Sequence, residues 1–102
     1  MKIKIKIFSP RTIINLKLDG EKEFIEFNGR ELNKNVEDYI NRILNIVSSW
    51  QNSYYNPMIL DSENFEVEII KNKETKKFGG AGNFPENYAE LKKLIGEIEN
   101  CF

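Results

Sequence analysis

The sequence contains no histidine, and its single cysteine is Cys101. Histidine is the commonest general base and metal ligand, and a cysteine thiolate is a common nucleophile. Carboxylates, lysine and tyrosine are therefore the side chains left to move protons. Neither a Cys/His cluster nor a calcium loop of alternating Asp residues occurs, so we expect no metal and no cofactor. These absences favour a protein that is not an enzyme.

The chain also lacks an excess of one charge and any long hydrophobic run. Its 15 basic and 16 acidic residues give a net charge of −1, so no long-range field draws it to nucleic acid or an anionic membrane. The longest strongly apolar run is residues 58–60, far below the ~20 residues of a membrane helix. Residues 1–8 alternate lysine with isoleucine and lack the apolar stretch of a signal peptide. Since one cysteine forms no internal disulfide, we expect a cytoplasmic protein, either monomer or homodimer.

The remaining composition is that of one globular domain, residues 1–102. Hydrophobic residues make up 40% and charged residues 30% of the chain, which is a typical globular balance. A period of two in the apolar residues predicts half-buried strands. These strands are expected at residues 1–8, 12–18, 23–28, 65–71 and 75–78.

Turn signals separate the predicted strands. Asp19-Gly20 predicts a tight hairpin turn, and Asn28-Gly29 is expected to end the third strand. Within that strand Phe24, Ile25 and Phe27 fall on both faces, which predicts either a strand covered on two sides or a bulge.

Apolar residues at three-and-four spacing predict a helix over residues 35–50, with Asn35 capping it through its side-chain oxygen. A second helix is expected to open near Pro85. Between the helices, residues 51–57 are expected to be irregular, and residues 58–60 form a short apolar piece. The arrangement that buries every apolar face is an α+β domain: an antiparallel sheet of five to six strands with two helices packed on one face, in the order βββ-α-ββ(β)-α. The uncovered face would carry Lys2, Lys4, Lys6, Asn15, Lys17, Glu66 and Glu68.

Four residues are candidates for partner binding. Tyr54 and Tyr55 follow the first helix in a polar loop, and tyrosine is enriched in binding interfaces. Glu66 and Glu68 share a strand face, as a catalytic dyad would, although a surface pair beside lysines is the more ordinary arrangement. A carboxylate-dependent enzyme therefore stays open as an alternative.

The glycine-rich segment 79–82 is a candidate anion site. Its exposed N–H groups precede a helix, so Gly80 and Gly82, together with Lys77, would be the residues that hold a phosphate. The segment has neither the Gly-Lys-Ser/Thr ending of a P-loop nor the spacing of a dinucleotide fingerprint. Glycines that let the chain leave the sheet edge are the simpler interpretation.

The C-terminal half carries a recognisable pattern of turns and aromatic residues. A tryptophan near the end of a helix is followed by an Asp-containing turn, an aromatic strand residue and a Gly-x-Asn-aromatic-Pro-x-x-aromatic helix entry. Here these elements are Trp50, Asp61-Ser62, Phe65 and Gly82-Asn83-Phe84-Pro85-Glu86-Asn87-Tyr88. This half resembles small uncharacterised bacterial proteins, some of which are similar to immunity proteins that neutralise a toxin domain. The resemblance implies an inhibitor that acts by binding.

The sequence therefore favours a non-enzymatic protein-interaction module, most concretely an immunity-type inhibitor of a toxin or nuclease. Its partner would be another protein, reached through the open sheet face or through Tyr54 and Tyr55. Besides the carboxylate-dependent enzyme, two alternatives remain: a small-ligand or anion binder that uses the Gly79–Gly82 segment, and a phage or mobile-element inhibitor of a host enzyme.

Overall fold

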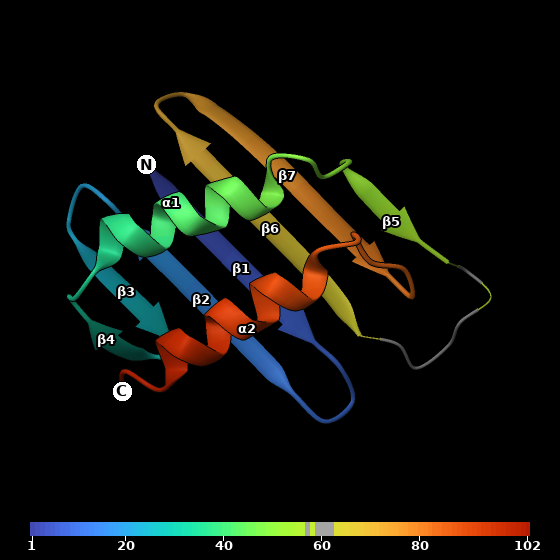
Figure 1. The fold of residues 1–102 in the computed structure, drawn as a ribbon, viewed down its shortest axis with the longest axis horizontal. Helices are drawn as coiled ribbons and strands as arrows, with labels where there is room; N and C mark the ends of the chain where they lie inside the picture. The colour runs from blue at the N-terminus through green and yellow to red at the C-terminus, as the bar shows by residue number, and fades with distance from the viewer. Residues whose placement is uncertain (57, 59–62) are drawn as a thin grey trace.

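The computed structural model describes residues 1–56, 58 and 63–102, and within them lie seven strands and two helices. The elements are β1 (Lys2–Phe8), β2 (Ile13–Asp19), β3 (Phe24–Phe27), β4 (Arg30–Leu32), α1 (Val36–Val47), β5 (Ser53–Tyr55), β6 (Asn64–Lys71), β7 (Glu74–Ala81) and α2 (Tyr88–Glu99). All strands join one sheet in the order β4-β3-β2-β1-β6-β7-β5. Both helices cross the same face of that sheet (Figure 1). The α+β class and the two-layer arrangement were predicted correctly.

Strand β1 lies at the centre of the sheet because it pairs with β2 on one side and with β6 on the other. Its three isoleucines, Ile3, Ile5 and Ile7, are buried beneath the helices, while Lys4 and Lys6 are exposed on the opposite face. The period-two pattern of β1 therefore predicts correctly which face of the strand the helices cover.

The core lies between the sheet and the apolar stripes of α1 and α2. Trp50 follows the end of α1 yet remains buried, since its ring packs edge-on against Phe65 and Phe78 at centroid distances of 5.6 and 6.0 Å. The buried helix residues are Val36, Tyr39, Ile40, Ile43 and Val47 of α1, and Tyr88, Leu91, Leu94, Ile95 and Ile98 of α2. Leu44 and Phe102, which share these predicted stripes, are partly buried against the core.

One asparagine ties the end of α1 to the start of α2. Oδ1 of Asn87 accepts a hydrogen bond of 2.5 Å from Nε1 of Trp50, and Nδ2 of Asn87 donates to the backbone oxygen of Ile46 at 2.8 Å. The last carbonyls of a helix have no partner within the helix. Asn87 thus satisfies both an indole donor and a helix-end acceptor.

The sequence analysis did not predict the two strands at the edges of the sheet, β4 and β5. Asn28 and Gly29 adopt positive φ values of 48° and 87° and end β3 as predicted, but they also turn the chain back into β4, which pairs with β3. The segment expected to be irregular contains β5, which pairs with β7 in parallel. The sheet is therefore mixed rather than antiparallel. Along the chain, the elements follow one another in the order ββββ-α-βββ-α.

The turn after β2 also differs from the expectation. Residues 20–23 form a four-residue connection, and the positive φ of 53° belongs to Glu23. The side chain of Asp19 is buried and accepts backbone N–H groups of Glu21 and Lys22 at 3.0 and 3.1 Å. A buried side chain that organises the loop replaces the expected two-residue turn.

Asn35 is the N-cap residue of α1, as predicted, but the expected capping bond of α1 and the start of α2 need correction. Asn35 has φ 55° and ψ 29° and makes no side-chain capping bond, because the left-handed conformation does not direct its side chain at the first turn. Helix α2 begins at Tyr88, three residues after Pro85, whose carbonyl oxygen accepts the N–H of Tyr88 at 3.1 Å.

Strand β7 continues through Ala81, so Gly79 and Gly80 stay in the sheet instead of leaving it. A Cβ on Gly80 would overlap the backbone oxygen of Tyr54 and lie 2.7 Å from the Phe65 ring. Glycine at this position permits the close approach of β5.

The double-sided pattern of β3 has a simple explanation. The strand pairs with β2 in a regular register without a bulge. Phe24 lies on the uncovered face, where Nζ of Lys17 lies 5.7 Å from its ring centroid. Of the apolar piece at 58–60, residues 59 and 60 lie outside the described residues, and the Met58 side chain is exposed.

Candidate interaction surface

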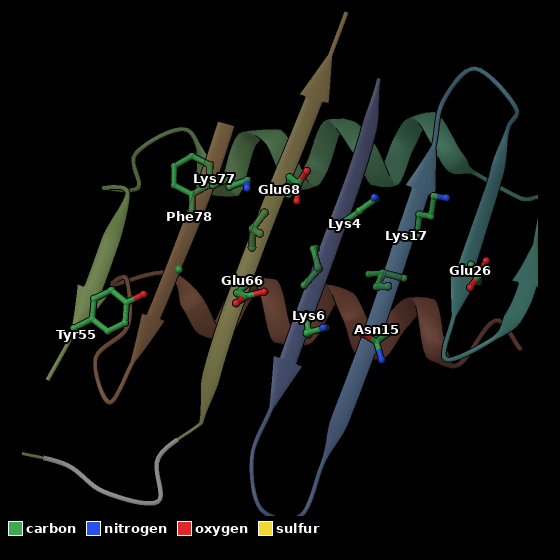
Figure 2. A pocket seen from close by; sticks show the side chains of 14 residues that line it. Lys4, Lys6, Asn15, Lys17, Glu26, Tyr55, Glu66, Glu68, Lys77 and Phe78 are labelled. Atoms are coloured by element: carbon green, nitrogen blue, oxygen red, sulfur yellow. The ribbon is translucent and has the colours of Figure 1, made fainter. Parts of the chain in front are cut away.

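Charged side chains form rows across the sheet face that the helices leave open (Figure 2). One row crosses five strands, because Lys17 pairs with Glu26 and Lys4, and Lys4 and Lys77 both pair with Glu68. The next row contains Asn15, Lys6, Glu66 and Gly79. Glu68 thus lies between Lys4 of β1 and Lys77 of β7, whereas Glu66 lies between Lys6 and Gly79.

These charges line a shallow hollow of about 500 Å³ on the open face. Among the described residues, no ion pair within 4.0 Å involves Lys4, Lys6, Glu66 or Glu68. Exposed charges separated by more than this distance interact weakly across water. Their ammonium and carboxylate groups are therefore available to charges of a partner.

Gly79 and Tyr55 shape one end of the hollow. A Cβ on Gly79 would lie 3.2 Å from the backbone oxygen of Phe65 and 3.9 Å from the Tyr55 hydroxyl oxygen, so a side chain at this position would crowd this end of the hollow. Tyr55 is 65% exposed, and its hydroxyl points toward β7 (Figure 2). An exposed tyrosine beside a hollow presents both apolar area and a hydrogen-bonding group.

The structure separates the two tyrosines that the sequence analysis grouped. Successive strand residues point to opposite faces, so Tyr54 lies on the helix side, partly buried against Phe65 at a centroid distance of 6.2 Å. Its hydroxyl accepts the N–H of Gln51 at 2.8 Å. Tyr54 therefore anchors the chain before β5, and Tyr55 alone joins Glu66 and Glu68 on the open face.

The three candidate anion-binding residues do not converge. Lys77 lines the open-face hollow. Tyr54 and Phe65 occupy the space where a side chain of Gly80 would lie. Gly82 has φ 74° and forms an isolated β-bridge with Tyr55. Anion binding by this segment stays a prediction.

A polar cluster of Glu63, Tyr88 and Lys92 lies where the chain enters β6. The Tyr88 hydroxyl donates to one Glu63 oxygen at 2.6 Å, and Nζ of Lys92 lies 3.0 Å from the other. Burial of the phenol and the nearby carboxylate raise the pKa of Tyr88, so the phenol stays protonated and donates. In the part of the chain that the structure describes, His, Cys, Asp and Glu side chains form no group of three or more.

Sequence reasoning missed Glu26 and Gly79 as parts of this surface. The strand containing Glu26 was recognised, but its two-sided apolar pattern hid the side to which the glutamate points. Gly79 was assigned to a loop because glycine is rare in strand interiors. The signal that places it correctly is the partner strand β5, which the sequence did not reveal.

Neither protein families, nor curated proteins, nor solved structures give a match to this chain. Helices α1 and α2 have 12 residues each, and no helix among the described residues has the length and apolar character needed to cross a bilayer.

Proposed function

We propose that this chain is a non-enzymatic protein-binding module and that the open face of its sheet is the binding surface. The observation that supports this proposal most is the row from Glu26 to Lys77, in which charges of both signs stand side by side on the sheet and, among the residues that the structure describes, form no ion pair within 4.0 Å. Charges fixed in this way favour a partner of complementary pattern and disfavour others.

Tyr55 strengthens this proposal. Its exposed ring stands at the rim of the hollow, beside Gly79. Binding energy at interfaces concentrates in tyrosine, tryptophan and arginine side chains that fill pockets. We expect Tyr55 to supply apolar contact area and the charged rows to set orientation.

The resemblance in the C-terminal half makes a toxin or nuclease domain the first partner class to test. An immunity-type inhibitor acts by covering a surface, which a flat and polar sheet face suits. A cytoplasmic location belongs to the same proposal, and so does a phage or mobile-element inhibitor as its closest variant.

The test is a charge exchange that preserves net charge. Lys4 and Glu68 face each other across β1 and β6, so the double variant Lys4→Glu/Glu68→Lys keeps a cross-strand pair of opposite charges. The matched control, Lys34→Glu/Glu90→Lys, exchanges two exposed charges outside the open-face hollow. Each protein, carrying an affinity tag, is expressed in the native host and captured.

We expect the wild type and the control to retain the same polypeptide, and the open-face exchange to lose it while keeping its urea midpoint. Retention of that polypeptide by the open-face exchange, or capture of none by the wild type, would refute the proposal. If the retained polypeptide is an enzyme, its inhibition by the wild type and by the control, but not by the open-face exchange, identifies the inhibitor class.

A further inference from the structure

Strand β7 has an outer edge that is covered over only part of its length. Strand β5 pairs with Gly79–Ala81, and within the described residues no strand lies beside Glu74–Phe78 (Figure 1). This open stretch of five residues is about 17 Å long at about 3.4 Å per residue. Such an edge offers backbone groups to an added strand.

The contacts of β5 indicate which backbone groups face outward. The N–H of Gly79 donates to the oxygen of Asn52 at 3.0 Å, and the oxygen of Ala81 accepts the N–H of Asn56 at 2.9 Å. Alternate residues of a strand direct their N–H and C=O to the same side. Thr75 and Lys77 therefore point both backbone groups at the open edge.

A groove of about 730 Å³ lies along this edge, between the end of α1 and the β6–β7 hairpin. Leu44 and Val47 form its wall on the helix, and Ile69 and Phe78 form its apolar floor. Nζ of Lys76 lies 5.5 Å from the Phe78 ring centroid at the rim. Side chains of an added strand that point to the helix side would enter this groove.

The edge is basic although the whole chain has a net charge of −1. Residues 71–77 contain four lysines and one glutamate. Edge-to-edge pairing of two copies would bring Lys76 and Lys77 close to the same lysines of the second copy, and like charges across strands are destabilising. The charge therefore favours an acidic strand over a second copy.

We propose that the outer edge of β7 binds an extended peptide that alternates acidic and apolar residues, as an added strand. Its backbone would bond to Thr75 and Lys77, its apolar side chains would enter the groove against Leu44, and its acidic side chains would lie beside Lys77 on the opposite face. Strand addition of this kind draws affinity from the backbone and specificity from alternate side chains. This site shares Lys77 with the open-face surface but depends on the backbone edge of β7, so it stands whether or not the proposed function holds.

The probe is a fluorescein-labelled nine-residue peptide of alternating glutamate and valine. Its comparison peptides alternate lysine with valine, or place the same glutamates and valines in two blocks. Fluorescence anisotropy at low salt should show binding of the alternating acidic peptide, at least tenfold weaker binding of the block peptide and none of the basic peptide. Equal binding of the alternating and block peptides would overturn the proposal, because charge alone would then account for binding.

The matched variants are Thr75→Pro, which removes one outward N–H, and Thr75→Val, which keeps it. Proline is tolerated on an edge strand where its missing N–H faces solvent. We expect Thr75→Pro to weaken binding at least tenfold and Thr75→Val to bind like the wild type. Lys77→Glu should also weaken binding, because the acidic side chains lose their cation, whereas Lys34→Glu, distant in the fold at the entry to α1, should not.

Hydrogen exchange of the wild type tests the same edge without any substitution. Added peptide should slow exchange of the Thr75 and Lys77 amides and leave the inward-facing Lys76 amide unchanged. Unchanged exchange at both residues with peptide bound, or equal affinity of the Thr75→Pro and Thr75→Val variants, would contradict the proposal.

Discussion

Nε1 of Trp50 donates to Oδ1 of Asn87 at 2.5 Å, and this bond joins the chain after α1 to the residue before α2. Asn87 also holds the oxygen of Ile46, so Asn87→Ala leaves one donor and one acceptor without a partner. A buried polar group that loses its partner costs about 1–3 kcal/mol. We therefore expect Asn87→Ala to lower the free energy of unfolding by about 2 kcal/mol, measured by urea denaturation.

Asn100→Ala is the control for that change. Asn100 is exposed at the end of α2, where its backbone N–H rather than its side chain makes the bonds. Its replacement should shift stability by less than about 0.5 kcal/mol. Equal effects of the two substitutions would show that the Asn87 bonds contribute little.

Glycine substitutions should separate a tight position from an open one. The Cβ of Gly80→Ala would overlap the backbone of Tyr54, and overpacking of this kind costs about 1–3 kcal/mol. Gly96→Ala in α2 meets nothing within 4 Å, and alanine in a helix is about 0.5–1 kcal/mol more favourable than glycine. Thermal unfolding should show a lower midpoint for Gly80→Ala and a higher one for Gly96→Ala.

Asp19 should make the fold sensitive to acid. Burial by itself raises the pKa of Asp19, but the N–H groups of Lys22 and Glu21 and the charge of Lys2 outweigh it, so the pKa lies below its ordinary value of 3.8. A carboxylate with a lowered folded-state pKa stabilises the fold above its unfolded-state pKa, and this stabilisation is lost as pH falls through the folded-state value.

The measurement is the urea midpoint as a function of pH from about 6 down to 2, a range that includes the ordinary pKa of an aspartate. Asp19→Asn keeps an oxygen acceptor for the loop but has no charge to lose. We expect its midpoint to fall less steeply below about pH 4 than that of the wild type. An unchanged slope would contradict the role given to Asp19.

The Tyr39 hydroxyl and the Cys101 thiol share a hydrogen bond of 3.4 Å between α1 and the C-terminal residues. This bond, with burial, raises the pKa of Tyr39 from 10.0 to about 12. We expect Cys101→Ala to lower the pKa of Tyr39, followed by NMR of tyrosine ring carbons, because the hydroxyl loses that partner. Cys101→Ser keeps a hydrogen-bonding group there and should lower it less.

The raised pKa also fixes the sign of the alkaline response. Tyr39 supports folding fully below the ordinary tyrosine pKa of 10.0, and this support is lost as pH rises toward about 12. Wild-type stability should thus fall more steeply than that of Cys101→Ala across this interval. Identical alkaline profiles would exclude a contribution from the bond.

Local patterns in the sequence predict much of this fold, and contacts between distant segments account for what they miss. Ile3, Ile5 and Ile7 identify a buried strand face without further information, because alternation is a property of the strand itself. Strand β5 has only three residues and exists through its pairing with β7, so nothing within its own residues marks it. Gly79 and Gly80 were misassigned for the same reason.

The candidate surface was predicted in the same partial way. Glu66 and Glu68 were placed on the open face because their strand alternates, and the structure puts them there beside Lys4 and Lys6. Tyr54 was assigned no side, since the register that turns it inward is set by Gly80 on a strand far along the chain. The groove along β7 depends on how far α1 extends over the sheet, and periodicity does not specify that distance.

The central position of β1 has a consequence during synthesis. Its neighbour β2 emerges from the ribosome directly after it, whereas β6 begins only at Asn64, so β1 keeps one long, bare flank while most of the polypeptide is translated. Non-local pairing of this kind is slow and leaves a nascent chain prone to aggregation. The lysines that alternate along β1 would repel a second nascent chain at that flank and keep it vacant until its own β6 arrives.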